Sequence, residues 1–259
     1  MRKNMLRKGL MTITLLMLNL LTLQARGAPD LNTYIGVEGG LSTFSFEQKL
    51  DQQLVFPMAN LTGGIAWERL SLAGTLSGSI ADADVSEEDF TGSATRRDVD
   101  VTLGYQVLDN VSVFVGLKQG TTELDVVSRD EMNPVVANEE YDQSGVYLGA
   151  STGVSIGEGK LDVSIAYADL SSDNRFFADV EVDIEPEELE FDDISGANSG
   201  ESTGFSFSVT WNQPINGDLL FRARFRHNVY EQDITFMGST FSGIQEDNTS
   251  LSVGVLGVF

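Results

Sequence analysis

Alternation of apolar and small polar residues with a period of two is the feature that most constrains this chain. In residues 70–80 the even positions are Leu, Leu, Gly, Leu, Gly and Ile, and the odd positions are Ser, Ala, Thr, Ser and Ser. A β-strand directs alternate side chains to opposite faces, so one face of this strand is apolar and the other is lined with small polar groups. Similar segments recur at 33–41, 55–67, 70–80, 99–107, 111–117, 146–156, 161–167, 203–211, 219–225 and 251–259. The sequence therefore predicts an all-β protein of about ten strands.

The links between these segments alternate between short and long. Short links are expected at 68–69, 108–110, 157–160 and 212–218, and longer, acidic links at 44–53, 82–96, 119–141, 169–201 and 229–247. About five apolar positions per tilted strand span roughly 25 Å, the height of a hydrocarbon band, and small residues suit a concave interior. We therefore expect a transmembrane antiparallel up-and-down β-barrel. Residues 121–127 and 234–242 could be strand extensions or an extra pair, so eight or twelve strands are alternatives.

The N-terminus has the pattern of a secretory signal peptide. Basic residues in 2–8 precede a mostly apolar run over 10–23, which is shorter than the roughly 20 residues that a spanning helix needs. We expect residues 1–27 to be the signal peptide, with cleavage after Ala25 or Gly27, and residues 28–259 to be the barrel.

The charge of the predicted mature chain excludes one class of partner. Residues 1–27 contain five of the 16 basic residues and none of the 39 acidic ones, so the mature formal charge is about −28. Nucleic-acid binding is therefore not expected. The chain has no cysteine, so disulfides and thiolate metal sites are excluded, and we expect no cofactor.

Four aromatic residues fall at or near the short-link ends of their predicted strands. A membrane barrel carries girdles of aromatic side chains at the membrane interfaces. The sequence predicts such interfacial positions for Trp67, Tyr105, Trp211 and Phe259.

The C-terminal segment SLSVGVLGVF resembles the last strand of Gram-negative outer-membrane β-barrel proteins. That strand typically ends in Phe with apolar residues at every second position before it, which Leu251, Val253, Val255 and Phe259 match, whereas Gly257 stands where a large residue is commoner. The segment VTLGYQVLDNVSVFVGLKQG also looks like a hairpin of small barrels of this class. The resemblance implies location in the cell outer membrane, contact with its lipid and lipopolysaccharide, and recognition of Phe259 by the barrel-assembly machinery.

Charged residues alternate on the predicted lumen face. The phase of the predicted strands directs a basic ladder inward in an otherwise acidic chain, together with four carboxylates and one lysine. Unpaired charges in a narrow lumen are costly, so these groups form either an internal salt-bridge plug or the charged eyelet of a narrow channel. The predicted network consists of Glu38, Asp98, Asp100, Lys118, Asp162, Arg222, Arg224 and Arg226.

The single histidine limits the possible enzyme chemistry. His227 is the chain's only histidine, and its odd position places it on the lipid-facing side near the external rim. A rim hydrolase would need it as a general base. Without a flanking motif of a known hydrolase, we expect the protein not to be an enzyme.

The longest predicted loop is strongly acidic. Carboxylates favour hard divalent cations, which makes Asp179, Glu181 and Asp183 weak candidate ligands, although no cage pattern of a known calcium site is present. A solvated, repulsive surface loop is the competing interpretation.

Three functional hypotheses follow. The favoured one is a structural or surface-interaction barrel with acidic extracellular loops, and the second is a narrow, porin-like conduit for small solutes lined by the arginine ladder. The third is a rim hydrolase that uses His227. A soluble periplasmic β-sandwich is the remaining structural alternative.

Overall fold

The computed structural model describes residues 31–46, 53–86, 90–129, 136–178, 196–236 and 239–259. Their secondary structure is almost entirely β-strand. The strands are β1 (Leu31–Phe46), β2 (Leu54–Trp67), β3 (Leu70–Ser79), β4 (Ala83–Asp84), β5 (Phe90–Leu108), β6 (Val111–Ser128), β7 (Val136–Ile156), β8 (Gly159–Ala178), β9 (Gly196–Asn216), β10 (Leu219–Phe236) and β11 (Ser239–Val258). Within the described residues, no helix is long and apolar enough to cross a membrane. The predicted signal peptide lies outside the described residues.

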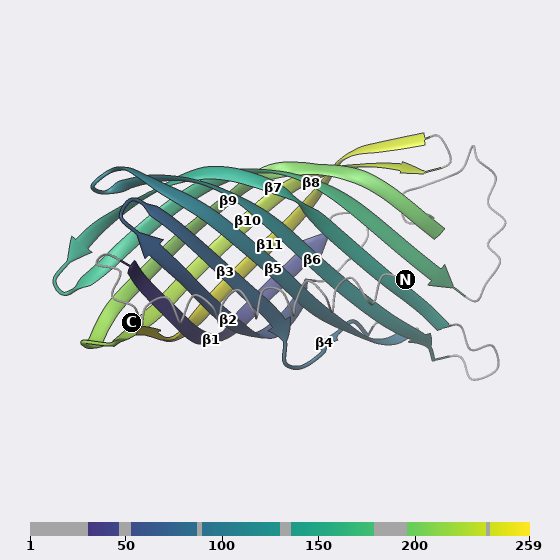
Figure 1. The fold of residues 1–259 in the computed structure, drawn as a ribbon. Coiled ribbons are helices and arrows are strands. Elements are labelled where there is room, and N and C mark those ends of the chain that lie inside the picture. The colour runs from purple at the N-terminus through teal and green to yellow at the C-terminus, as the bar shows by residue number, and fades with distance from the viewer. Residues whose placement is uncertain (1–30, 47–52, 87–89, 130–135, 179–195, 237–238) are drawn as a thin grey trace.

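The strands close into a ring (Figure 1). Each long strand pairs antiparallel with the next along the chain, β1 pairs with β11, and β3 pairs with β5. The two-residue strand β4 adds only to the edge of β5 beyond the end of β3. The predicted all-β, ten-strand antiparallel barrel is therefore confirmed, and closure leaves no open edge along the paired strands.

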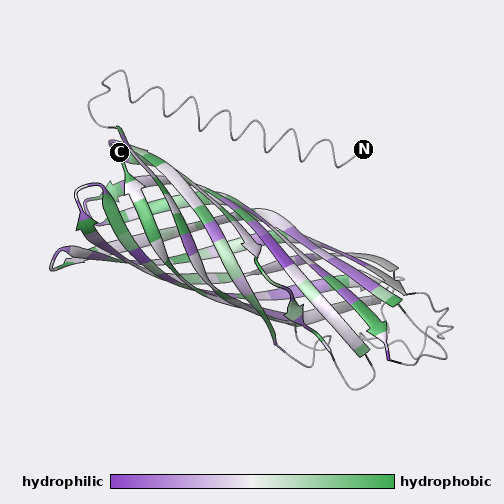
Figure 2. Ribbon diagram, turned by 90° about the horizontal axis from the view of Figure 1, so that it is seen from below, coloured by the Kyte–Doolittle hydropathy of each residue, from purple (hydrophilic) through white to green (hydrophobic). Residues whose placement is uncertain are grey.

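A belt of exposed apolar side chains surrounds the end of the barrel that carries the short turns. Outward residues such as Val37, Leu117 and Leu148 are 60, 61 and 63% exposed. Figure 2 shows hydrophobic and hydrophilic residues alternating along the strands. Such a continuous apolar belt is unfavourable in water and is suited to hydrocarbon. We call this part of the wall the hydrophobic belt.

Four tight turns close the hairpins at this end, at 68–69, 109–110, 157–158 and 217–218. In two of these turns Glu68 and Gly157 have positive φ angles of 51° and 62°, as in the favoured two-residue hairpin turns. The predicted link at 212–218 is too long, because β9 continues to Asn216 and passes Pro214 within the ladder.

The predicted long links are wrong in their extent. The segment 119–141 was expected to be a loop, but β6 continues to Ser128 and β7 begins at Val136. Residues 121–127 extend an existing strand and do not form an extra pair. Beyond the hydrophobic belt most outward positions are polar, as at Glu123 and Asp125, so the apolar alternation weakens while the backbone ladder continues.

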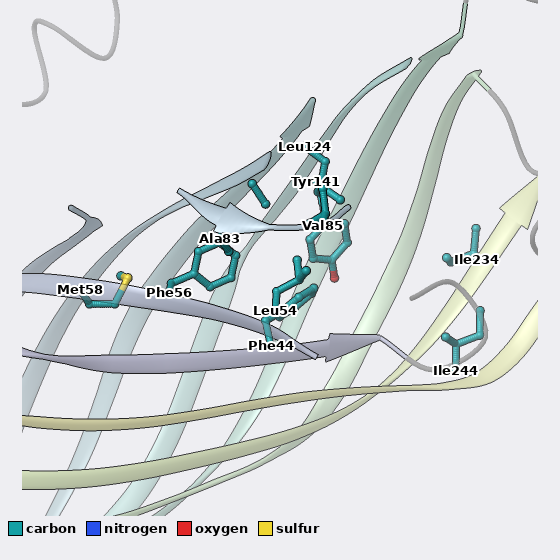
Figure 3. Packing of buried hydrophobic residues seen from close by; sticks show 11 residues of the cluster. Phe44, Leu54, Phe56, Met58, Ala83, Val85, Leu124, Tyr141, Ile234 and Ile244 are labelled. Atoms are coloured by element: carbon teal, nitrogen blue, oxygen red, sulfur yellow. The ribbon is translucent and has the colours of Figure 1, made fainter. Parts of the chain in front are cut away.

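The strand extensions enclose an apolar cluster inside the barrel (Figure 3). Phe44 on β1 and Tyr141 on β7 lie five strands apart in the ring, and their ring centroids are 6.2 Å apart. Leu54 and Phe56 on the neighbouring strand β2 are 0% exposed. Apolar side chains therefore fill the lumen at this level. We call this set the apolar plug; it comprises Phe44, Leu54, Phe56, Met58, Ala83, Val85, Ala94, Leu124, Tyr141, Ile234 and Ile244.

Candidate functional site in the barrel lumen

The basic ladder on β10 faces a buried carboxylate on β1. Arg222, Arg224 and Arg226 occupy every second position of β10 and point into the lumen. Arg224 Nη2 lies 2.6 Å from Glu38 Oε1, and Arg222 Nη1 lies 3.6 Å from the same oxygen. Ser252 Oγ donates to Glu38 Oε2 at 2.8 Å, and the Glu38 side chain is 0% exposed. One carboxylate is therefore shared by two guanidinium groups.

The third arginine crosses the lumen. Arg226 Nη1 lies 3.4 Å from Asp100 Oδ2 on β5. The strand order places β5 and β10 five strands apart in both directions around the ring, so they are opposite walls. This ion pair therefore spans the full width of the interior.

Asp100 is held by two further donors. Tyr147 Oη donates to Asp100 Oδ1 at 2.6 Å, and Thr102 Oγ1 donates to the same oxygen at 3.1 Å. The Tyr147 ring lies over its cross-strand neighbour Gly116, where a Cβ atom would come within 2.2 Å of the ring. Gly116 thus leaves the space that lets Tyr147 reach Asp100.

Lys118 is adjacent to Asp100 in the β5–β6 ladder but does not pair with it. Its Nζ donates to Tyr230 Oη at 3.2 Å and lies 4.9 Å from the centroid of that ring. Among the described residues no ion pair joins Lys118 to a carboxylate. Tyr230 is on β10, so this contact also bridges distant walls.

The other two predicted acids have partners of their own. Asp98 forms an ion pair with Arg96 at 3.0 Å. Asp162 lies near the short-turn end, 2.8 Å from Lys160 Nζ. Asn212 joins it to the ladder indirectly, since Asn212 Nδ2 donates to Asp162 at 3.3 Å and Asn212 Oδ1 accepts from Arg222 Nε at 2.8 Å.

A second polar layer, next to the apolar plug, was not predicted from the sequence. Glu246 Oε2 accepts hydrogen bonds from Tyr141 Oη at 2.7 Å and from Gln143 Nε2 at 3.0 Å. These residues lie on β11 and β7, four strands apart in the ring. Burial raises the pKa of Glu246 above its ordinary value of 4.5 and also raises the pKa of Tyr141. The layer was not predicted because Tyr141 and Glu246 lie in segments expected to be loops.

Two cavities remain between these contacts. A cavity of about 80 Å³ lies toward the apolar plug and is lined by residues including Asn60, Ser77 and Arg224. A larger one of about 270 Å³ extends toward Asp162 and Ser208. Both are lined by Asp100, Lys118, Arg226 and Asn228, so the contact between Arg226 and Asp100 stands between them.

The four predicted interfacial aromatics lie at the short-turn end of the barrel. Trp67, Tyr105 and Phe259 are 57, 46 and 61% exposed, and Trp211 is partly buried. Phe259 continues the ladder of β1, because its backbone exchanges two hydrogen bonds with Thr33. A Cβ at Gly257 would lie 3.1 Å from the Phe259 ring. A larger residue at position 257 would therefore require a small shift of the Phe259 ring.

His227 lies on the outer face, away from the lumen network. Its Nδ1 forms a 2.8 Å hydrogen bond with Thr249 Oγ1 on β11. The acidic candidates Asp179, Glu181 and Asp183 lie outside the described residues. Within the described part of the chain, no group of three or more His, Asp or Glu side chains is placed to hold a metal ion.

Comparison with known proteins identifies the fold. The chain matches no protein-family model and, at a significant level, no curated protein sequence. The translocator domain of autotransporter NalP from Neisseria meningitidis is similar, with a TM-score of 0.51, 13% identity and coverage of 96% of this chain and 97% of that chain. The chain has the fold of outer-membrane β-barrel proteins.

Two other solved structures are more distant in shape. The β domain of the Bordetella autotransporter BrkA has a TM-score of 0.47 at 10% identity, with coverage of 89% of this chain and 100% of that chain. The outer-membrane protease OmpT from Escherichia coli has a TM-score of 0.45 at 10% identity, with coverage of 89% and 97%.

Proposed function

We propose that this outer-membrane-type barrel resides in the Gram-negative outer membrane as a closed, non-enzymatic element with a structural or surface-interaction role. Its hydrophobic belt would contact outer-membrane lipid, and the strand extensions with their acidic links would face lipopolysaccharide and the medium. The barrel-assembly machinery would recognise Phe259 at the end of the last strand. The acidic loops would attract divalent cations.

The contacts that join opposite walls of the lumen carry this proposal. Arg226 and Asp100 meet across the ring at one level, and Phe44 and Tyr141 meet across it at the level of the apolar plug. Tyr141 also binds Glu246 from four strands away. Ions and solutes would have to separate these contacts before they could pass. A barrel filled in this way acts as a rigid support for whatever its external end displays.

The absence of enzymatic function is part of the proposal. His227 is the only histidine in the chain, and its described contact is a threonine hydroxyl on the outer face. A histidine-dependent hydrolase needs its general base within reach of a bound substrate, whereas His227 lines neither of the two lumen cavities.

A narrow conduit is the second candidate function, and the two cavities on either side of the Arg226–Asp100 contact favour it. Recording from the purified mature chain in planar lipid bilayers distinguishes the two functions. The closed barrel predicts no steady conductance for the wild type. A stable, anion- or cation-selective current that changes with Arg226→Ala would overturn the closed barrel and support the conduit.

A further inference from the structure

Cationic side chains outnumber their carboxylate partners in the middle of the lumen. Arg222 and Arg224 share the single carboxylate of Glu38, and Arg226 pairs with Asp100. The nearby Asp98 is matched by Arg96, so it adds no net charge to this set.

Lys118 adds a cationic group that forms no ion pair with a carboxylate among the described residues. Its contacts are the hydroxyl and ring of Tyr230, and its ladder neighbour Asp100 is occupied by Arg226, Tyr147 and Thr102. Glu246, the next carboxylate along the lumen, interacts with the charge of Lys118 at longer range, but its hydrogen bonds go to Tyr141 and Gln143. These four cations therefore have only two carboxylates, Glu38 and Asp100, as direct ion-pair partners, in a chain whose formal net charge is −23.

Lys118 lies where there is space for a ligand, and the carboxylates that share the cavity walls, Asp98, Asp100 and Asp162, each have a cationic partner of their own. Lys118, Arg226 and Asn228 line both cavities and offer ammonium, guanidinium and amide donors at their junction. The smaller cavity alone, at about 80 Å³, exceeds several-fold the roughly 10–15 Å³ that one water needs. Ser77, Asn60 and Asn248 supply further hydrogen-bonding groups around it.

We propose that the middle of the lumen binds a small oxyanion, of the phosphate or dicarboxylate class, with Lys118 as its main cationic contact. An enclosed cation without a directly paired counter-charge is unfavourable, and a bound anion would supply that counter-charge to Lys118. Oxyanions also accept the charge-assisted hydrogen bonds that ammonium and guanidinium groups donate. The serine hydroxyls of the larger cavity would surround the body of an organic dicarboxylate.

Isothermal titration of the folded, mature barrel in non-ionic detergent tests this site. Inorganic phosphate and malonate are titrated separately at constant ionic strength in sodium chloride, so that the inorganic and organic ligands are distinguished. We expect saturable binding of at least one of the two anions. Lys118→Met, which keeps the length of the side chain without its charge, should weaken that binding at least tenfold, and Lys118→Arg should retain it.

Lys160→Met is the matched control. Lys160 is also a lysine of the barrel, but it is 58% exposed and pairs with Asp162 near the short turns, so its loss should leave anion binding unchanged. Heat-modifiable migration in gels verifies folding, and Lys118→Gln replaces Lys118→Met if the latter does not fold. Absence of saturable binding by the wild type, or equal binding by the charge-removing Lys118 variant, would overturn the proposal. The outcome of this titration does not depend on whether the barrel conducts ions, so the anion site and the closed barrel can fail separately.

Discussion

Arg226 and Asp100 meet at 3.4 Å although their strands occupy opposite walls of the barrel. Replacing Asp100 with Asn removes the charge but keeps the shape, so Arg226 is left without its counter-charge inside the lumen. We expect the free energy of unfolding to fall by about 1–3 kcal/mol. Urea unfolding in detergent micelles, followed by the fluorescence of Trp67 and Trp211, measures the change.

Asp162→Asn is the control for this prediction. Asp162 also pairs with a cation, but that cation, Lys160, is 58% exposed, and exposed ion pairs contribute only about 0–1 kcal/mol. Equal losses in the two variants would contradict the importance of the pair across the lumen.

Gly116→Ala should act through Tyr147. The added Cβ would come within 2.2 Å of the ring, which must move away and release its 2.6 Å hydrogen bond to Asp100. We expect a loss of unfolding free energy that is strongly non-additive with Tyr147→Phe in a double-mutant cycle. Gly74→Ala is the control, because its Cβ would meet only a backbone oxygen, at an ordinary distance of 3.7 Å.

Phe56→Ala should create a cavity in the apolar plug and lower the free energy of unfolding. Phe56 is 0% exposed, and removing such a ring from a packed interior costs about 3–5 kcal/mol. Urea unfolding measures this loss, and bilayer recording tests whether the variant shows current bursts that the wild type lacks. Phe90→Ala, at a ring that is 37% exposed, should cost much less. Similar losses at the two positions would show that the plug does not stabilise the barrel.

Phe259→Ala separates assembly in the cell from intrinsic stability. The variant keeps the two backbone hydrogen bonds to Thr33, so refolding into detergent should change little. If the terminal ring is a recognition signal, the folded fraction in cell outer membranes should fall several-fold, as measured by heat-modifiable migration. An unchanged folded fraction in cells would remove Phe259 from the proposed recognition.

The period-two pattern made the wall of the barrel predictable. Within the hydrophobic belt one face of each strand must be apolar and the other small or polar. The inward direction of Arg222, Arg224 and Arg226 therefore follows from the two-residue period of a strand. Their partners did not follow, because the meeting of Arg226 with Asp100 depends on which strands lie opposite after closure. Lys118 and Asp100, both members of the predicted network, are neighbours in the ladder, yet they do not form an ion pair.

The apolar plug was missed for a different reason. Residues 54–59 read Leu, Val, Phe, Pro, Met and Ala, so both phases of the strand are apolar there. The outward phase continues the hydrophobic belt, and the inward phase supplies Leu54, Phe56 and Met58 to the plug. A continuous apolar run is typical of a strand that is buried on both faces. This run is the sequence feature from which the apolar plug could have been predicted. The charged outward positions of β6 and β7 concealed the rest of the extensions.

Glu246 should make stability depend on pH. It lies beyond the hydrophobic belt, between the outward polar residues Gln245 and Asp247, and burial raises its pKa in the folded state. The folded protein therefore holds this proton more tightly than the unfolded chain. Its favourable contribution is complete below the ordinary value of 4.5 and is lost as the pH rises through the folded-state pKa.

Glu246→Gln removes this titration, so the stability of the wild type relative to the variant should decrease as the pH rises above about 4.5. Urea midpoints measured between roughly pH 4 and 8 follow the difference. Tyr141→Phe provides a second test, because the Tyr141 hydroxyl donates to Glu246 Oε2 at 2.7 Å and that bond is stronger to the charged carboxylate. The Phe variant should therefore lose more stability at high pH than at low pH. A difference between wild type and Glu246→Gln that stays constant with pH would show that Glu246 does not titrate in this range.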